Sequence, residues 1–226
     1  FGVGYDAVDA VEAGRRGIVV TNTPDVLNEE VADTALGLLL MTVRQLPRSE
    51  LYLRAGRWES EGNFPLSPSL RGRTMGIVGL GRIGKAIARR AETFGLKIAY
   101  FGRNRQADVP YAFYDDIVAM ARDVSILMVI VPGGAATRHL VDRKVLEALG
   151  PDGFLINVAR GTVVDEAALI DVLAERGIAG AGLDVFENEP HVPAALLALE
   201  SVVLLPHVGS ASQHTRDLMG DLVVDN

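Results

Sequence analysis

Side chains suited to proton transfer and to anion binding follow three apolar runs of the sequence. Arg160 closes "FLINVARG", Asp184 lies in "AGLDVFENEP" ahead of Glu187 and Glu189, and His207 follows "VVLLP". Because parallel sheets bind their ligands at the carboxyl ends of the strands, we expect these side chains to meet at one edge of a sheet. A cation, a carboxylate and an imidazole in one place suit binding of a carboxylate substrate and transfer of a proton.

The other three histidines lack this setting. His139 follows an arginine near an expected helix start, His191 follows a proline in a loop, and His214 lies in the last expected helix. We interpret all three as surface residues, which leaves His207 as the histidine suited to acid–base chemistry.

The glycine-rich stretch "GIVGLGRIG" (76–84) indicates a second kind of chemistry. An apolar run precedes it and an amphipathic segment follows, the context in which the GxGxxG motif binds a dinucleotide. Gly79 permits the tight turn, Gly81 leaves room for the pyrophosphate, and Gly84 lets the helix pack closely on the strand. Backbone N–H groups near Arg82 and Ile83 then face the phosphates at the helix N-terminus.

Two arginines stand where many dinucleotide-binding units carry an acid. In such units an Asp or Glu roughly 20 residues after the turn binds the 2′-hydroxyl of the ribose. Here "KIAYFGRNRQ" (97–106) carries Arg103 and Arg105, and no Asp or Glu occurs from 93 to 107. Without the acid there is no repulsion of a 2′-phosphate, and the arginines add attraction. We therefore expect NADP(H) to be preferred over NAD(H); the alternative interpretation is a solvated basic turn.

Composition narrows the class of protein. The chain has 226 residues, a net charge of −7 and no cysteine. The acidic balance, with no basic stripe, argues against nucleic acid as a partner. The longest apolar run, 35–43, is too short for a membrane helix, which needs about 20 residues. The absence of cysteine excludes disulfides and thiolate metal sites and suits a reducing cytosol. We expect a cytoplasmic protein with no metal site and no membrane partner.

Strand-like apolar runs alternate with helix-like segments along the chain. This alternation predicts an α/β fold, a Rossmann-type doubly wound parallel sheet with right-handed crossovers. The expected strands are Ile18–Thr21, Thr74–Val78, Lys97–Phe101, Val124–Val131, Phe154–Val158, Ala181–Val185 and Val202–Leu205. The expected helices are Glu29–Ala55, Ile83–Phe94, Asp115–Arg122, Arg143–Leu149, Glu166–Arg176 and Ala211–Val224.

The first long helix should begin at an Asn28 cap and should be kinked or divided at Pro47. The polar stretch that follows, "GRWESEGNFPLSPSLRGR" (56–73), is either a surface loop or an arm that reaches a second subunit. Because twofold dimers are the commonest symmetric assembly, we expect a homodimer built around 28–68.

Taken together, the motifs resemble the D-isomer-specific 2-hydroxyacid dehydrogenase family. The matching pieces are "GVGYDAVD", "GIVVTNTPDVLNEEVAD", "GIVGLGRIG", "LINVARGTVVDEAAL", "GLDVFENEP" and "LLPHVGSAS". The resemblance implies part of a second, flavodoxin-like substrate domain, and it also favours a homodimer. The implied divisions are the end of the substrate domain (1–27), an interdomain helix and dimer arm (28–73), the dinucleotide-binding domain (74–206) and a return to the substrate domain (207–226).

The resemblance also implies a role for each matching residue. Arg160 corresponds to the arginine that grips the substrate carboxylate, His207 to the general acid/base, and Glu189 to the carboxylate paired with it. Asp184 corresponds to the group that orients the nicotinamide amide. The residues implied to line the cofactor are Val131, Pro132, Thr137, Val158, Ala159 and Gly209, and those implied to offer backbone N–H groups to the substrate are Val3 and Gly4.

Two departures from the family pattern bear on specificity. Gly133 and Gly134 stand where many relatives carry a bulkier pair, which puts the contacts on the adenine side in doubt. The acid after the second strand is missing, and relatives that reduce glyoxylate and hydroxypyruvate with NADPH carry an arginine there. The main hypothesis is therefore an NADPH-dependent reductase of such small 2-keto acids. The alternatives are an NAD-linked dehydrogenase of another 2-hydroxy acid, such as phosphoglycerate, and a cofactor-sensing protein similar to a corepressor.

Overall fold

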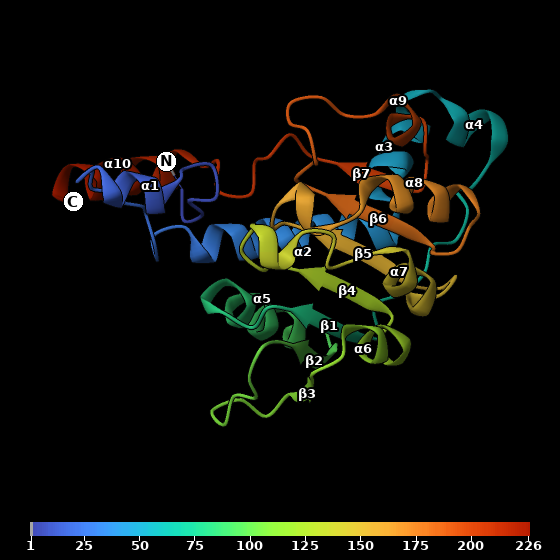
Figure 1. The fold of residues 1–226 in the computed structure, drawn as a ribbon. Helices are drawn as coiled ribbons and strands as arrows, with labels where there is room; N and C mark the ends of the chain where they lie inside the picture. The colour runs from blue at the N-terminus through green and yellow to red at the C-terminus, as the bar shows by residue number, and fades with distance from the viewer. Residues whose placement is uncertain (1) are drawn as a thin grey trace.

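Seven apolar segments of the sequence form one parallel sheet in the computed structural model, which describes residues 2–226 (Figure 1). The strand order is β3-β2-β1-β4-β5-β6-β7. The strands are β1 (Thr74–Val78), β2 (Lys97–Phe101), β3 (Ala112–Tyr114), β4 (Ile126–Val129), β5 (Phe154–Asn157), β6 (Gly180–Leu183) and β7 (Val202–Leu204). The order reverses direction between β1 and β4, as in a doubly wound Rossmann sheet, so the predicted fold class is confirmed.

Helices cover both faces of this sheet (Figure 1). The α-helices are α1 (Ala10–Arg15), α2 (Asn28–Arg44), α3 (Leu46–Arg54), α4 (Arg57–Glu61), α5 (Arg82–Thr93), α6 (Ile117–Asp123), α7 (Arg143–Leu149), α8 (Glu166–Ala174), α9 (Ala194–Leu197) and α10 (Gln213–Asp225). Helices α2 and α5 share one hydrophobic core with the sheet, and α6, α7 and α8 share the other. Burial on both faces explains why the central strands are continuous apolar runs.

The register of the sheet brings the strand ends into one row. Val78 pairs with Phe101 on one side and with Val129 on the other, and Asn157 pairs with Val129 and Leu183. The loops that carry the predicted site residues therefore leave the sheet at the same edge. They are 79–81, 102–106, 130–134, 158–161, 184–189 and 205–209.

Helix α2 begins and ends differently from the sequence prediction. Asn28 does not cap it, because Leu27 is the N-cap residue and the Asn28 side chain instead donates from Nδ2 to Oδ1 of Asp25, 3.2 Å away. The predicted division of the long helix is confirmed. Gln45, with φ of 52°, separates α2 from α3, and Pro47 stands in the first turn of α3.

Two short elements correct other expectations. Ile18–Thr21 is not a strand: it forms no β-bridge with any described residue, and Ile18 and Val19 are 57% and 85% exposed. The three-residue edge strand β3 was missed because it is too short to show alternation. The strand expected at Val124–Val131 is confirmed in its centre but spans only Ile126–Val129.

The two ends of the chain lie together, away from the sheet. Figure 1 shows α1 and α10 side by side at the left, and Nδ2 of Asn226 donates to the carbonyl oxygen of Asn22 at 3.1 Å. Helix α10 is also tied to α2, since Thr215 donates from Oγ1 to Oε2 of Glu30 at 3.2 Å. Of the helices described in residues 2–226, none has the length and apolar content needed to cross a membrane.

Candidate active site

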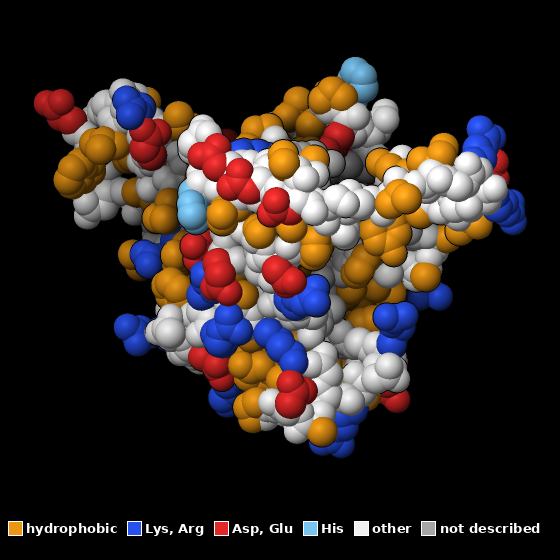
Figure 2. All heavy atoms as spheres, turned by 90° about the vertical axis from the view of Figure 1, so that its left-hand side faces the viewer, with side chains coloured by type: hydrophobic (Ala, Val, Ile, Leu, Met, Phe, Trp, Pro, Cys, Tyr) orange, Lys and Arg blue, Asp and Glu red, His pale blue; other side chains and the backbone are white. Residues whose placement is uncertain are grey.

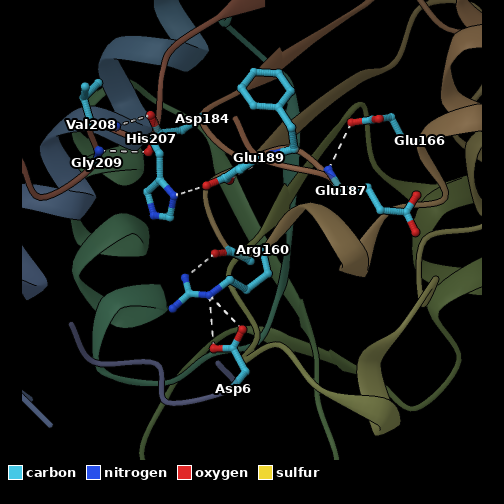
Figure 3. Close-up of polar contacts among 11 residues, drawn as sticks. Asp6, Arg160, Glu166, Asp184, Glu187, Glu189, His207, Val208 and Gly209 are labelled. Carbon is cyan, nitrogen blue, oxygen red and sulfur yellow. Dashed lines mark hydrogen bonds and ion pairs between the residues drawn. The ribbon is translucent and has the colours of Figure 1, made fainter. Parts of the chain in front are cut away.

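A histidine and a glutamate face each other at the carboxyl edge of β6 and β7. Nδ1 of His207 lies 2.7 Å from Oε2 of Glu189 (Figure 3). A carboxylate at this distance accepts a hydrogen bond from the Nδ1–H group, so Nε2 is the ring nitrogen that can exchange a proton with a substrate. Figure 3 shows that free nitrogen pointing away from Glu189, on the side of the Arg160 guanidinium. The pair therefore has the arrangement of a positioned general acid/base.

The glutamate is itself held by its own turn. The backbone N–H of Phe186 donates to Oε1 of Glu189 at 3.1 Å, so both carboxylate oxygens have partners. The neighbouring Glu187 faces the other way and accepts from Arg138 at 2.7 Å, with Nε2 of His139 2.9 Å away. His139 is therefore half-buried in an ionic cluster, which corrects its interpretation as a plain surface residue.

Asp184 fixes the backbone that presents the histidine. Its two carboxylate oxygens accept from the N–H groups of Val208, at 2.7 Å, and Gly209, at 2.8 Å. The side chain is only 2% exposed, and this burial raises the pKa of the Asp184 carboxyl, while the two backbone hydrogen bonds oppose the rise. His207 itself has φ of 53°, a left-handed conformation that the following turn must enforce. Asp184 thus holds the loop in which His207 stands.

Arg160 lies below the histidine and is fixed along one side (Figure 3). Its Nε donates to both oxygens of Asp6, at 3.2 and 3.3 Å, and its Nη1 donates to the carbonyl oxygen of Ala159 at 2.7 Å. The turn that carries it is closed by Asn157, which donates to the Arg160 carbonyl and accepts from the Ala159 N–H. Nη2 has no acceptor among residues 2–226 and remains available to an anion.

The two residues implied to bind substrate through their backbones lie close to this arginine. A Cβ placed on Gly4 would be 2.0 Å from Nη2 of Arg160, so the chain of the N-terminal segment passes directly over the guanidinium. The carbonyl of Val3 accepts from Nδ2 of Asn22 at 2.9 Å, and its N–H group has no acceptor among residues 2–226. Gly133 approaches from the other side, because its Cβ would be 2.8 Å from Cγ of Arg160. Gly133 therefore borders the arginine, a contact that the sequence did not indicate.

The glycine-rich turn has the geometry of a dinucleotide cradle. Gly79 has φ of 99° and donates its N–H to the carbonyl of Phe101. A Cβ on Gly84 would be 2.3 Å from the carbonyl oxygen of Gly79, so only glycine lets α5 approach the turn. A Cβ on Gly81 would meet nothing within 4 Å, so this position opens outward to the space a pyrophosphate requires. The turn fits a dinucleotide.

The start of α5 points into the same space. Helix α5 begins at Arg82, and its first N–H groups are unsatisfied within the helix, as at any helix N-terminus. Ile83 packs on the core and anchors this turn. The side chain of Arg82 reaches Oδ1 of Asp25 at 3.1 Å, which links the cradle to the segment before α2. The helix dipole favours a negative ligand here, while the charge of Arg82 is partly compensated by Asp25.

Arg103 and Arg105 project from the loop after β2, beside the cradle. Both are exposed, and neither has a hydrogen-bond or ion-pair partner among residues 2–226. The loop itself is anchored, because the backbone N–H of Gln106 donates to the Tyr100 hydroxyl and its side chain donates to the carbonyl of Leu80. Figure 2 shows Lys and Arg side chains at mid-height and below on the side of the molecule that carries α5 and this loop, with Asp and Glu side chains among them.

The nearest carboxylate along the chain is already compensated. Asp108 accepts from Nζ of Lys85 at 2.7 Å, and this hydrogen bond lowers the pKa of the Asp108 carboxyl. The positive charge of the two loop arginines is therefore not cancelled by a neighbouring ion pair. A ligand phosphate beside the loop would meet two arginines that have no ion-pair partner in the described part of the chain.

The remaining residues implied to line the cofactor also lie at this edge. Oγ1 of Thr137 donates to the carbonyl of Pro132 at 2.7 Å, and a Cβ on Gly79 would touch Cγ1 of Val131 at 2.7 Å. Val158 and Ala159 are buried, with exposed fractions of 7% and 4%. The carbonyl of Gly209 accepts from Thr34 at 3.1 Å, so its turn is fixed from two sides.

Three residues of the site were not predicted as site residues. Asp6 contacts Arg160, Asn157 closes the turn before it, and Gly133 makes room beside it. Asn157 gave one signal, since it is a polar residue inside an apolar strand and is 1% exposed. Asp6 stands in the quoted "GVGYDAVD", but nothing in the local pattern connects it to a residue 154 positions away.

The chain matches the model of the NAD binding domain of the D-isomer specific 2-hydroxyacid dehydrogenases over residues 36–209. It is 51% identical to the glyoxylate/hydroxypyruvate reductase A of Arabidopsis thaliana and 48% identical to the hydroxyphenylpyruvate reductase of Plectranthus scutellarioides. Each match covers 100% of the chain and 72% of the relative.

A solved structure is similar in fold and in sequence. It is the NADPH-dependent glyoxylate/hydroxypyruvate reductase of Sinorhizobium meliloti, in complex with NADP and malonate. It superposes with a TM-score of 0.97 and 63% identity over 100% of this chain and 71% of that one. The similarity includes every segment that carries a site residue.

Proposed function

Because the chain belongs to the D-isomer specific 2-hydroxyacid dehydrogenase family, we propose that it reduces a small 2-keto acid of the glyoxylate or hydroxypyruvate type with NADPH. The chain is an NAD(P)-dependent oxidoreductase, and the product is the D-2-hydroxy acid. The observation that carries the proposal is the His207–Glu189 pair, 2.7 Å apart, standing beside Arg160 at the sheet edge that also bears the glycine-rich turn.

NADP(H) is the preferred cofactor, and NAD(H) is the second choice. The residues that would hold it are those of the cradle, Gly79, Gly81, Arg82 and Gly84, with Arg103 and Arg105 on the 2′-phosphate. When bound, this cofactor supplies the hydride that adds to the keto carbon. The chain's own contribution is to place the substrate, to supply a proton and to stabilise the charge that grows on the keto oxygen.

Arg160 binds the substrate carboxylate in this proposal. Its Nη2 has no acceptor among residues 2–226 and lies against the backbone of Gly4, so the proposal adds the N–H groups of Val3 and Gly4 as further donors to the same carboxylate. A guanidinium is planar and binds a carboxylate through parallel hydrogen bonds, which fixes the orientation of the keto carbon as well as its position.

His207 delivers the proton. As negative charge grows on the keto oxygen, the imidazolium transfers its Nε2 proton to that oxygen, and a positioned general acid of this kind contributes roughly 10²–10⁴-fold in rate. Glu189 stabilises the imidazolium and keeps its proton-bearing nitrogens in place. In the reverse direction the neutral imidazole accepts the hydroxyl proton at the same nitrogen.

One set of cofactor assays distinguishes the proposed reductase from the NAD-linked dehydrogenase and the corepressor-like protein. NADPH consumption is measured with glyoxylate, hydroxypyruvate, 4-hydroxyphenylpyruvate and pyruvate, and NAD+ reduction with 3-phosphoglycerate. Turnover with glyoxylate or hydroxypyruvate supports the proposal, and turnover with 4-hydroxyphenylpyruvate alone favours the second relative's chemistry. NAD+-linked oxidation of phosphoglycerate would favour the dehydrogenase alternative. Binding of NADPH with no turnover of any acid would favour the corepressor-like alternative.

Assembly and location belong to the proposal as well. We propose a homodimer, because α3, α4 and the segment after them expose several large apolar side chains. They are Leu46, Leu51, Leu53, Trp58 and Leu66, with exposed fractions between 44% and 101%. A cytoplasmic location suits a chain without cysteine. The proposed partner is the small acid substrate, with no nucleic acid and no membrane.

A further inference from the structure

The Asp6–Arg160 contact joins the N-terminal segment to the loop after β5, across 154 positions of sequence. Each side chain is 30% exposed, so the pair is partly buried. Both carboxylate oxygens converge on Nε, while Nη1 is committed to the carbonyl of Ala159. The guanidinium plane is thus held from two sides, and the Nη2 corner is left without an acceptor in residues 2–226.

Two glycines make room for this arrangement. A Cβ on Gly133 would lie 2.8 Å from Cγ of Arg160 and 3.1 Å from Oδ2 of Asp6, so a side chain there would push against both partners. A Cβ on Gly4 would lie 2.0 Å from Nη2. Gly133 has no positive φ, so alanine is conformationally allowed and the cost of a side chain there is contact alone. Many relatives carry a bulkier residue at position 133. In this chain, the space that such a side chain would fill is occupied by Arg160 and Asp6.

We propose that Asp6 is a positioning residue for substrate binding, which acts by holding the Arg160 guanidinium with its Nη2 corner toward the substrate carboxylate, and that Gly133 is the glycine this pairing requires. This inference rests on the proposed function. Asp6 does not touch the reacting atoms. It removes the rotational freedom that a long arginine side chain would otherwise lose on binding substrate.

The central experiment is Asp6→Asn, compared with wild type and with Asp221→Asn as a matched control. Asp221 is exposed on α10 and has no partner among residues 2–226, so its variant loses the same charge without touching Arg160. The measurements are kcat and KM for glyoxylate, the dissociation constant of oxamate in the NADPH complex, the dissociation constant of NADPH, and Tm.

For Asp6→Asn we expect KM for glyoxylate and the oxamate dissociation constant to rise together by roughly tenfold, the lower end of the range for a charge-assisted hydrogen bond, because the pair is partly exposed. The NADPH dissociation constant and Tm should match wild type within error. A purely structural role for Asp6 would instead lower Tm and weaken NADPH as well. The Asp221→Asn control should show none of these changes.

Gly133→Ala gives an independent test that keeps both charges. We expect it to raise KM in the same direction. In the double variant with Asp6→Asn the two effects should be less than additive, because both act on one guanidinium. If Asp6→Asn does not fold, the KM of Gly133→Ala for glyoxylate tests the inference by itself. A KM for glyoxylate that is unchanged or lower in either folded variant would overturn the inference. Absence of keto-acid reduction by the wild type would instead contradict the proposed function.

Discussion

Replacing Arg103 by aspartate should remove the preference for NADPH. Arg103 and Arg105 are exposed cations without partners in residues 2–226, on a loop that Gln106 anchors to the glycine-rich turn. The turn fixes the adenine ribose at the end of the second strand, so its 2′ position lies next to this loop. The variant turns an attraction for a 2′-phosphate into a repulsion and supplies an acceptor for a 2′-hydroxyl.

The expected magnitude follows from the number of contacts. A charge-assisted hydrogen bond contributes about 1.5–3 kcal/mol, which is roughly tenfold to a hundredfold in affinity. Two exposed arginines that share one phosphate do not contribute twice this amount. We therefore expect the wild type to prefer NADPH over NADH by roughly tens to a few hundred in kcat/KM. Arg103→Asp should abolish or invert that ratio, and its kcat/KM for NADH should equal or exceed that of wild type.

The assay is kcat/KM for both cofactors at saturating glyoxylate and fixed ionic strength, because exposed charges are screened by salt. The control is Arg71→Asp, which makes the same charge change at another exposed arginine whose side chain has no partner in the described chain. Because Arg71 lies just before β1, at the opposite end of the strand from the glycine turn, this variant should keep the wild-type ratio. The reasoning is wrong if the wild type prefers NADH, or if Arg103→Asp keeps its NADPH preference.

Three further predictions concern the catalytic edge and the assembly. His207→Asn should lower kcat by roughly 10²-fold or more, as for a lost general acid, with NADPH affinity nearly intact; His214→Asn, on exposed α10, is the control, and equal turnover in both variants would refute the assignment. Asp184→Asn should lower the free energy of unfolding by about 1–3 kcal/mol in urea titrations, because one backbone N–H of residues 208–209 loses its acceptor. Light scattering of the full-length protein should give a homodimer at micromolar concentration, and Trp58→Asp should weaken it; a monomeric wild type contradicts the proposed interface.

The fold could be predicted where local patterns carry the information. The central strands are buried on both faces and therefore appear as apolar runs, and the glycine spacing marks the one turn that must approach a ligand closely. Ile18–Thr21 has the same composition but no sheet beside it, so composition alone misled the prediction there. Helix α2 begins at Asn28 without using its side chain as a cap, because Asp25 holds that amide. A capping prediction from local sequence fails when the side chain that would form the cap is hydrogen-bonded to another residue.

The sequence predicted which strand ends carry the site residues, but it did not predict which residues contact them. Arg160, Asp184 and His207 each follow a strand, and parallel register alone brings them to one edge. The partners that orient them come from elsewhere. Asp6 lies in the segment before the first helix, and the two N–H groups that Asp184 binds are backbone groups, which no sequence motif distinguishes.

Gly133 is a second case in which the sequence did not reveal a contact. Its departure from the family pattern was visible in the sequence, but only the structure shows that a Cβ at this position would press against both Arg160 and Asp6. A glycine has no side-chain group from which a role could be inferred. Its role depends on which residues occupy the space that a side chain would fill, and only the structure shows them.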